Sequence, residues 1–376
     1  MHYRRFGRTG WSISVFSLGL MRCLANPAQL RETLAAALAA GVNHLETAKA
    51  YGESERYLGS ALQQLGVDPG DLRITSKLVP TADGAAFRRE IEACLDRLGL
   101  VRLDGLAIHG INTPAHLAQT LAPGGCLEAA EQARADGLVG EIGFSTHGDL
   151  ELVQRAIATD RFAFVNLHYY YFNPRLAPAV AVAAERDMGV FIISPADKGG
   201  LLYRPSEQLR EDCAPFDPLG LTYRWLLSDP RITTLSMGPA NPEELKAPLA
   251  WAEATGPLTP EESATLAQLG AVRAERLGAD ACSQCFACLP CPEEIRIPEV
   301  LRLRNLAMGH GMTEYGQYRY RMFENAGHWF PGRRGDRCTD CGDCLPRCPE
   351  QLAIPSLLRD AHERLRGPSR RRLWED

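Results

Sequence analysis

The chain has 376 residues, of which 45% are hydrophobic and 23% charged, and its formal net charge is −5 at pH 7. This length predicts two domains, or one large α/β barrel with an addition, and excludes a single small module. The ordinary composition and mild acidity give no sign of bulk disorder or of a nucleic-acid partner.

From residue 15 to residue 251, short apolar runs alternate with amphipathic stretches, which predicts alternating strands and helices. The eight predicted strands are 15–19, 42–46, 73–77, 105–108, 141–144, 164–167, 190–194 and 232–236. The eight predicted helices are 27–40, 54–65, 85–98, 126–136, 149–159, 176–187, 219–228 and 242–251. Eight strands that alternate with eight helices predict a (β/α)8 TIM barrel. An open doubly wound sheet is the alternative, but its G-x-G-x-x-G and Walker A signatures are both missing from the sequence.

Four side chains with useful chemistry fall at the ends of consecutive predicted strands. Glu46 and Tyr51 stand at and just after the second strand, Lys77 ends the third and His109 follows the fourth. Catalytic residues of TIM barrels come from the carboxyl ends of strands, so we expect one shared site. An ammonium group lowers the pKa of a nearby tyrosine, and a carboxylate keeps the lysine charged, which makes Tyr51 a candidate general acid. Each residue alone is more typical of an ordinary ion pair or loop contact; the combination favours catalysis.

Eight of the twelve cysteines lie in two runs near the C-terminus. The second run has the C-x2-C-x2-C-x3-C-P pattern of bacterial ferredoxins, and the first is one residue shorter before its last cysteine. In two-cluster ferredoxins the fourth cysteine of each run ligates the other [4Fe–4S] cluster. We therefore predict two crossed ligand sets: Cys282, Cys285, Cys288 and Cys348; and Cys338, Cys341, Cys344 and Cys291. Structural zinc is the alternative, although zinc sites usually pair two C-x2-C knuckles across a longer spacer.

The cysteine runs place a domain boundary just before residue 280. We predict a barrel over residues 1–277, a two-cluster domain over 278–361 and a basic tail over 362–376. The aromatic-rich segment between the runs is predicted to be helical over 298–308, and its aromatic side chains to serve packing. The four scattered cysteines are expected to be buried small hydrophobic residues.

The barrel motifs resemble the aldo-keto reductases, and with the cysteine runs they resemble the branch that carries a ferredoxin-type iron–sulfur domain. The motifs are Tyr3–Gly10, Asn43–Glu55, Ser76-Lys77, Ile108-His109 and Gly143–Ser145. The resemblance covers about residues 1–355. It implies a barrel that binds NADPH or NADH without a Rossmann fold and transfers hydride to a carbonyl. By position, Tyr51 would be the proton donor, Lys77 would lower its pKa, and His109 would orient the carbonyl; Glu46 stands where the family has aspartate.

The same resemblance implies a set of cofactor-binding residues. Ser145 matches a serine that contacts the nicotinamide carboxamide, but its usual asparagine neighbour is Thr146, and Asn166 stands where glutamine is common. Ile193 takes the place of a ring-stacking aromatic residue, and the loop 196–202 resembles the pyrophosphate loop. The implied set is Ser145, Asn166, Ser194, Pro195, Lys198, Gly199, Gly200, Gly238, Asn241 and Glu244.

The segment after the eighth predicted strand also predicts the start of a helix. Asn241 is the expected N-cap, Pro242 the first helical residue, and Glu244 is placed as in a capping box. Barrels commonly bind phosphate in the loops after strands seven and eight. Because Glu243 and Glu244 disfavour a 2′-phosphate, the choice between NADPH and NADH stays open.

Two functions are consistent with these patterns. The first is a cytoplasmic NAD(P)H-dependent reductase of a small-molecule carbonyl that carries two [4Fe–4S] clusters. The second is an iron–sulfur electron-transfer protein whose barrel binds a metabolite or partner without hydride chemistry. A redox partner protein suits both, whereas no nucleic acid or membrane is expected, because the longest uncharged stretch, residues 105–127, is interrupted by His, Pro, Gly and amide side chains.

Overall fold

The computed structural model describes residues 1–367. Contacts divide the chain into two units, one made of Met1–Gly199 and Thr222–Pro257, the other of Gly200–Leu221 and the chain from Leu258 onward. Helix α11 (Pro260–Leu277), which precedes the predicted boundary, groups with the second unit. The basic tail predicted over residues 362–376 overlaps the end of helix α14 (Ile354–Leu365), so the predicted start of the tail is wrong. Residues 368–376 lie outside the described residues. None of the helices in the described part of the chain is long and apolar enough to span a bilayer.

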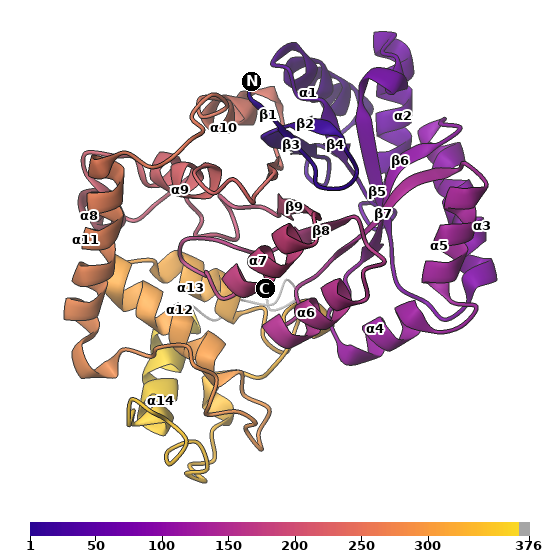
Figure 1. Cartoon of the computed structure of the whole chain (residues 1–376). Coiled ribbons are helices and arrows are strands. Elements are labelled where there is room, and N and C mark those ends of the chain that lie inside the picture. The colour runs from indigo at the N-terminus through magenta and orange to yellow at the C-terminus, as the bar shows by residue number, and fades with distance from the viewer. Residues whose placement is uncertain (368–376) are drawn as a thin grey trace, which may run out of the picture. The chain divides into compact units, whose positions relative to one another are not determined.

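The first unit is a closed barrel of eight parallel strands, which confirms the predicted TIM barrel (Figure 1). Its order is β10-β3-β4-β5-β6-β7-β8-β9, so β10 closes the barrel onto β3. The strands are β3 (Phe16–Gly19), β4 (His44–Glu46), β5 (Arg73–Leu78), β6 (Leu103–His109), β7 (Val139–Ser145), β8 (Phe164–Leu167), β9 (Gly189–Ile192) and β10 (Thr234–Met237). Most of their residues are buried, as expected for strands covered by helices on the outside and packed side chains within.

Helices cover the outside of the barrel (Figure 1). They are α1 (Pro27–Ala39), α2 (Ser54–Leu65), α3 (Gly84–Leu98), α4 (Pro114–Leu121), α5 (Cys126–Ala135), α6 (Leu150–Ala158), α7 (Ala177–Glu185) and α9 (Pro218–Leu227). Side-chain caps begin several of them, for example Asp83 on α3 and Asp149 on α6. The predicted helix 242–251 is instead a 3-10 turn, Pro242–Leu245, followed by the single turn α10 (Lys246–Leu249).

A short hairpin closes the amino-terminal end of the barrel. Strands β1 (Tyr3–Arg5) and β2 (Ser12–Ser14) pair antiparallel, and the Phe6 ring between them lies 5.4 Å from the ring of Phe164, where β8 begins. Phe6, Ile13, Phe164 and Phe191 form one buried cluster with Trp11 packed against it. Chemistry therefore has to take place at the opposite end, where the strands finish.

The second unit is helical and carries both cysteine runs. Its remaining helices are α8 (Glu207–Cys213), α12 (Ile297–His310) and α13 (Thr313–Tyr320). Helix α12 confirms the predicted 298–308 helix and is almost wholly buried. Aromatic side chains after it pack together, as expected, with the rings of Phe323 and Phe330 4.7 Å apart.

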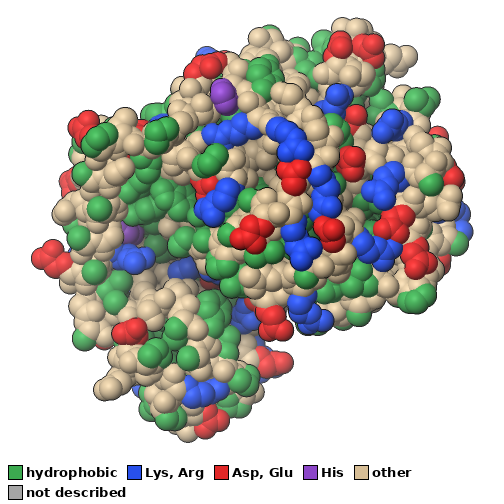
Figure 2. All heavy atoms as spheres, in the orientation of Figure 1, with side chains coloured by type: hydrophobic (Ala, Val, Ile, Leu, Met, Phe, Trp, Pro, Cys, Tyr) green, Lys and Arg blue, Asp and Glu red, His purple; other side chains and the backbone are tan. Residues whose placement is uncertain are grey.

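Acidic and basic side chains are interspersed over the face drawn in Figure 2. Many of the chain's surface charges form ion pairs, for example Arg5 with Asp187 at 2.6 Å and Arg8 with Asp160 at 2.7 Å. Exposed pairs of this kind contribute little to stability.

Candidate functional site

The four predicted catalytic residues lie together at the carboxyl end of the barrel. Glu46 ends β4, Lys77 lies near the end of β5 and His109 ends β6. Lys77 is only 2% exposed and Glu46 6%, and their charged groups form an ion pair. The Lys77 Nζ atom lies 4.7 Å from the centre of the Tyr51 ring, and the Tyr51 and His109 rings meet edge to face at 5.8 Å. The structure therefore brings the four together, while their catalytic roles stay predictions.

The turn that carries Tyr51 is fastened to the neighbouring strand. The backbone N–H groups of Thr47 and Lys49 donate to the carbonyls of Thr75 and Lys77 on β5, at 2.9 and 3.3 Å. Lys77 Nζ in turn donates to the Thr47 carbonyl at 2.9 Å. Gly52 has a φ of +55°, a conformation that glycine adopts without strain. These bonds hold the turn beside Lys77, and with it the tyrosine.

Burial and charge act in opposite directions on the two central groups. Burial lowers the pKa of the Lys77 ammonium, but Glu46 and Tyr51 together raise it by more, so Lys77 stays charged. Burial raises the pKa of the Tyr51 phenol, and the smaller lowering by Lys77 does not offset this. Lys77 thus acts on the Tyr51 pKa in the predicted direction, but the net shift is upward, because removal of the phenol from water outweighs one nearby ammonium.

Two predicted cofactor residues lie on the strands that follow His109. Ser145 ends β7, and its Oγ accepts a hydrogen bond from the Gly110 N–H at 3.0 Å. Asn166 on β8 is fully buried; its Nδ2 donates to Glu46 Oε1 at 3.0 Å, and its Oδ1 has no partner among the described residues. A buried acceptor of this kind fits an amide N–H of a bound nicotinamide.

Thr146, in contrast, makes its hydrogen bonds to the backbone of the protein. Its hydroxyl donates to the Ile111 carbonyl at 2.6 Å and accepts from the Gly148 N–H at 2.9 Å. These two hydrogen bonds stabilise the backbone after β7. With threonine in place of the family's asparagine at position 146, Ser145 is left as the polar side chain at the end of the strand.

The predicted pyrophosphate loop is a sequence of tight turns after β9. Ser194 has a φ of +46°, and the Lys198 N–H donates to the Ser194 carbonyl at 3.0 Å. A Cβ atom on Gly199 would lie 1.9 Å from the Pro195 carbonyl oxygen, so this position requires glycine. Gly200 belongs to the second unit, where a Cβ would lie 2.7 Å from Met312 Cε.

The segment after β10 differs from its predicted capping box. The Asn241 side chain accepts from the Glu244 N–H, as an N-cap does, but the Glu244 carboxylate accepts from the Ala240 N–H at 2.9 Å instead of from Asn241. Arg22 pairs with Glu244 at 2.9 Å and donates to the Gly238 carbonyl at 2.8 Å. Sequence reasoning missed this arginine because it belongs to the loop after β3, which meets β10 only through closure of the barrel.

Sequence reasoning also missed a polar chain after β7 and β8. His147 Nε2 and His168 Nε2 are 3.0 Å apart, His168 Nδ1 contacts the Tyr170 hydroxyl, and this hydroxyl donates to the Ile193 carbonyl at 2.6 Å. The available signal was that His168 directly follows the predicted strand 164–167 and that His147 stands three residues after the predicted strand 141–144.

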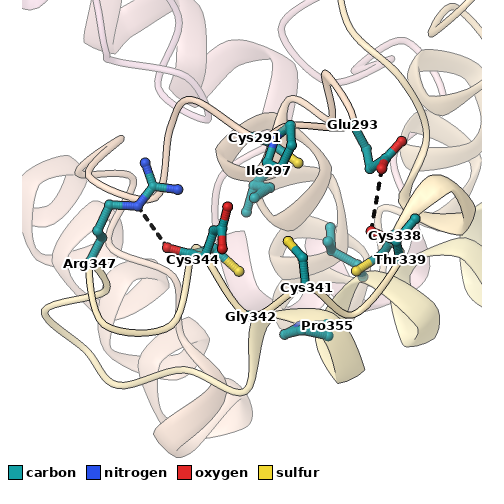
Figure 3. A pocket seen from close by; sticks show the side chains of 13 residues that line it. Cys291, Glu293, Ile297, Cys338, Thr339, Cys341, Gly342, Cys344, Arg347 and Pro355 are labelled. Atoms are coloured by element: carbon teal, nitrogen blue, oxygen red, sulfur yellow. Dashed lines mark hydrogen bonds between the residues drawn. The ribbon is translucent and has the colours of Figure 1, made fainter.

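The cysteines form two groups of four in the second unit. Cys291, Cys338, Cys341 and Cys344 line one cavity (Figure 3). Cys282, Cys285, Cys288 and Cys348 line another. The two groups have the same members as the two crossed ligand sets predicted from the spacing, and ligation of clusters by them stays a prediction. No three His, Cys, Asp or Glu side chains within residues 1–367 converge closely enough to hold a single metal ion.

The cysteine groups fit cationic clusters. Burial, with Cys282 and Cys285 nearby, raises the pKa of Cys288 to about 12, and burial also raises the pKa of Cys344. Neighbouring buried thiols become thiolates when a bound cation or cluster core compensates their charge. Arg347 lies beside the cavity of Cys291, Cys338, Cys341 and Cys344 (Figure 3). Its guanidinium donates to the carbonyls of Asp343 at 2.8 Å and Pro290 at 2.9 Å, which ties the two cysteine loops together.

Comparison with known proteins gives a family for the barrel and a domain type for the cysteine-rich segment. The sequence model of the Aldo/keto reductase family matches residues 17–215, more than half of the chain. The chain belongs to the aldo/keto reductase family. A 4Fe-4S dicluster domain matches residues 281–353 of this reductase homologue.

Curated relatives of this aldo/keto reductase family member include three proteins named aldo-keto reductase. An aldo-keto reductase of Mycolicibacterium vanbaalenii is 30% identical over 207 residues, covering 53% of this chain and 70% of the relative. Another, from Mycobacterium sp. strain KMS, is 39% identical over 101 residues, 27% of this chain, and the match spans only 36% of that relative's length. An aldo-keto reductase structure from Bacillus halodurans, in its holo form, superposes with a TM-score of 0.62 and 20% identity over 71% of this chain and 96% of its own.

Proposed function

We propose that this family member reduces the carbonyl group of a small molecule with NADH or NADPH and carries two [4Fe–4S] clusters. The observation that carries the proposal is the buried Glu46–Lys77 ion pair beneath Tyr51, with His109 at the edge of the same ring. A charged lysine has little reason to be 2% exposed at the end of a strand unless its charge acts on a neighbour.

Each residue has a role in this reaction. The bound dinucleotide supplies the hydride. Tyr51 donates its hydroxyl proton to the oxygen of the carbonyl as negative charge develops there, and the Lys77 ammonium stabilises the phenolate that remains. Glu46 keeps Lys77 charged, and His109 orients the carbonyl oxygen toward the phenol.

Residues of the neighbouring strands would hold the cofactor. Asn166 Oδ1 and Ser145 Oγ would contact the nicotinamide carboxamide; in support, both belong to buried side chains at the ends of adjacent strands. The turns over Ser194, Pro195, Lys198, Gly199 and Gly200 would bind the pyrophosphate, and Gly238, Asn241 and Glu244 the adenosine end.

Glu244 disfavours a 2′-phosphate both by its own charge and by its pairing with Arg22. We expect Glu244→Gln to improve NADPH binding relative to NADH by about two- to fivefold, the size of an interaction between half-exposed charges. Dissociation constants of both dinucleotides, measured by calorimetry, check this. Glu243→Gln is the matched control, because Glu243 pairs with Lys246 on the surface; an equal change in this control would contradict the role of Glu244.

Each group of four cysteines would hold one [4Fe–4S] cluster, and the clusters would pass single electrons to a redox partner protein. A cytoplasmic location suits the chain, since its cysteine ligands have to stay reduced.

The carbonyl reductase assignment is tested with the full-length, cluster-loaded chain under anaerobic conditions. We expect 4-nitrobenzaldehyde to be reduced to its alcohol with one NADH or NADPH consumed per alcohol formed. Absence of turnover with this aldehyde and with a panel of ketones and quinones would contradict the assignment.

A further inference from the structure

One hydrogen bond of the site crosses the barrel. Strands β4 and β8 are four places apart in the closed order of eight, so they stand on opposite walls. Glu46 on β4 and Asn166 on β8 nevertheless meet, with Asn166 Nδ2 3.0 Å from Glu46 Oε1. The same carboxylate oxygen forms the ion pair with Lys77. Both side chains are buried, Asn166 completely.

The chemistry of the contact fixes the orientation of the amide. A carboxylate only accepts hydrogen bonds, so the NH₂ side of Asn166 has to face Glu46 and the carbonyl side has to face away from it. Glu46 Oε1 thus lies between two donors, Lys77 Nζ and Asn166 Nδ2. Without Asn166, the carboxylate would be held on the Lys77 side alone.

We propose that Asn166 is a positioning residue: as a tether across the barrel, it holds the Glu46 carboxylate against Lys77 and so fixes the charge that governs Tyr51. The width of the barrel sets the combined length of the two side chains. Glutamate and asparagine together contain three methylene groups, the same number as aspartate and glutamine. A longer carboxylate on β4 is therefore matched by a shorter amide on β8. This inference rests on the proposed reductase function for its catalytic consequence, but not for the contact itself.

A reciprocal exchange tests the tether. Glu46→Asp shortens the bridge by one methylene and leaves buried donors unpaired, whereas Asn166→Gln overfills it. We expect each single variant to lower kcat for 4-nitrobenzaldehyde about 10- to 100-fold, the range for a lost hydrogen bond to a charged group. The double variant Glu46→Asp/Asn166→Gln should return to within about threefold of the wild type, because the two effects are coupled through one contact.

Two further readouts separate the tether from general damage to the fold. The thermal unfolding midpoint of the cluster-loaded chain should fall in each single variant and recover in the double variant, with or without turnover. The alkaline limb of kcat against pH should move in the single variants and return in the double, since the position of Glu46 affects Lys77 and Tyr51.

Asn173→Gln combined with Glu46→Asp is the matched control. Asn173 is also buried at this end of the barrel, so the variant adds the same methylene away from the bridge, and it should rescue nothing. Additive losses in Glu46→Asp/Asn166→Gln, in both kcat and unfolding midpoint, would overturn the tether. If the wild type reduces no carbonyl, the reductase proposal fails by itself, and the unfolding midpoints still decide whether the tether exists.

Discussion

Replacing Tyr51 by phenylalanine should lower the rate of carbonyl reduction by about two to four orders of magnitude, the usual contribution of a positioned general acid. The substitution removes one oxygen atom and keeps the ring that lies beside Lys77 and His109. Dinucleotide affinity should stay within about threefold of the wild type, because Tyr51 acts on the developing oxyanion and not on the cofactor. Single-turnover rates with saturating NADH or NADPH measure the effect without contribution from product release.

The pH dependence gives a second test of the same role. A general acid works only in its protonated form, and the pKa of Tyr51 lies above its ordinary value of 10 because of burial. Activity that depends on protonated Tyr51 should therefore persist as the pH rises to 10 and fall only above pH 10.

Tyr57→Phe, on helix α2, is the matched control for Tyr51→Phe and should keep full turnover. Full turnover in Tyr51→Phe would remove Tyr51 as the acid.

Replacing Cys291 by serine should damage the cluster held by the second cysteine run, although Cys291 belongs to the first. The reason is its place around the cavity of Cys338, Cys341 and Cys344. The iron content should fall from about eight to about four atoms per chain, as loss of one [4Fe–4S] cube requires. Cys348→Ser should damage the other cluster, because Cys348 shares a cavity with the first three cysteines.

Reference variants identify which cluster is lost. Cys341→Ser and Cys285→Ser each remove an exposed ligand from one cavity. The electron paramagnetic resonance spectrum of reduced Cys291→Ser should match that of Cys341→Ser, and that of Cys348→Ser should match Cys285→Ser. The opposite matching would show uncrossed ligand sets, and stoichiometric zinc in place of iron would contradict the clusters altogether.

The sequence predicted the features whose physical cause is local. All eight barrel strands were predicted, since strands buried on both sides are continuous apolar runs. The two cysteine groups follow from spacing because ligands three residues apart can reach one cube. Helix α4 was missed because its segment is short and uncharged, and the helix expected at 242–251 divides into two short turns.

Contacts that form only when the barrel closes could not be predicted from the sequence. Glu46 and Asn166 were each noticed as departures from the family pattern, but their meeting requires opposite walls of the closed sheet. The pairing of Arg22 with Glu244 likewise joins the first and last strands. The lowering of the Tyr51 pKa by Lys77 was predicted, but the larger raising by burial was not, because burial of the phenol depends on the whole surrounding fold.

The most direct test of the central claim is calorimetric titration of NADH and NADPH into the anaerobically prepared full-length chain with both clusters loaded. The account predicts saturable binding of at least one dinucleotide at one site per chain, and weaker binding in Asn166→Ala, which removes the buried acceptor. Absence of binding by either dinucleotide, in heat and in tryptophan fluorescence, would contradict hydride chemistry in this barrel. The chain would then be an iron–sulfur electron-transfer protein built on an aldo/keto reductase fold.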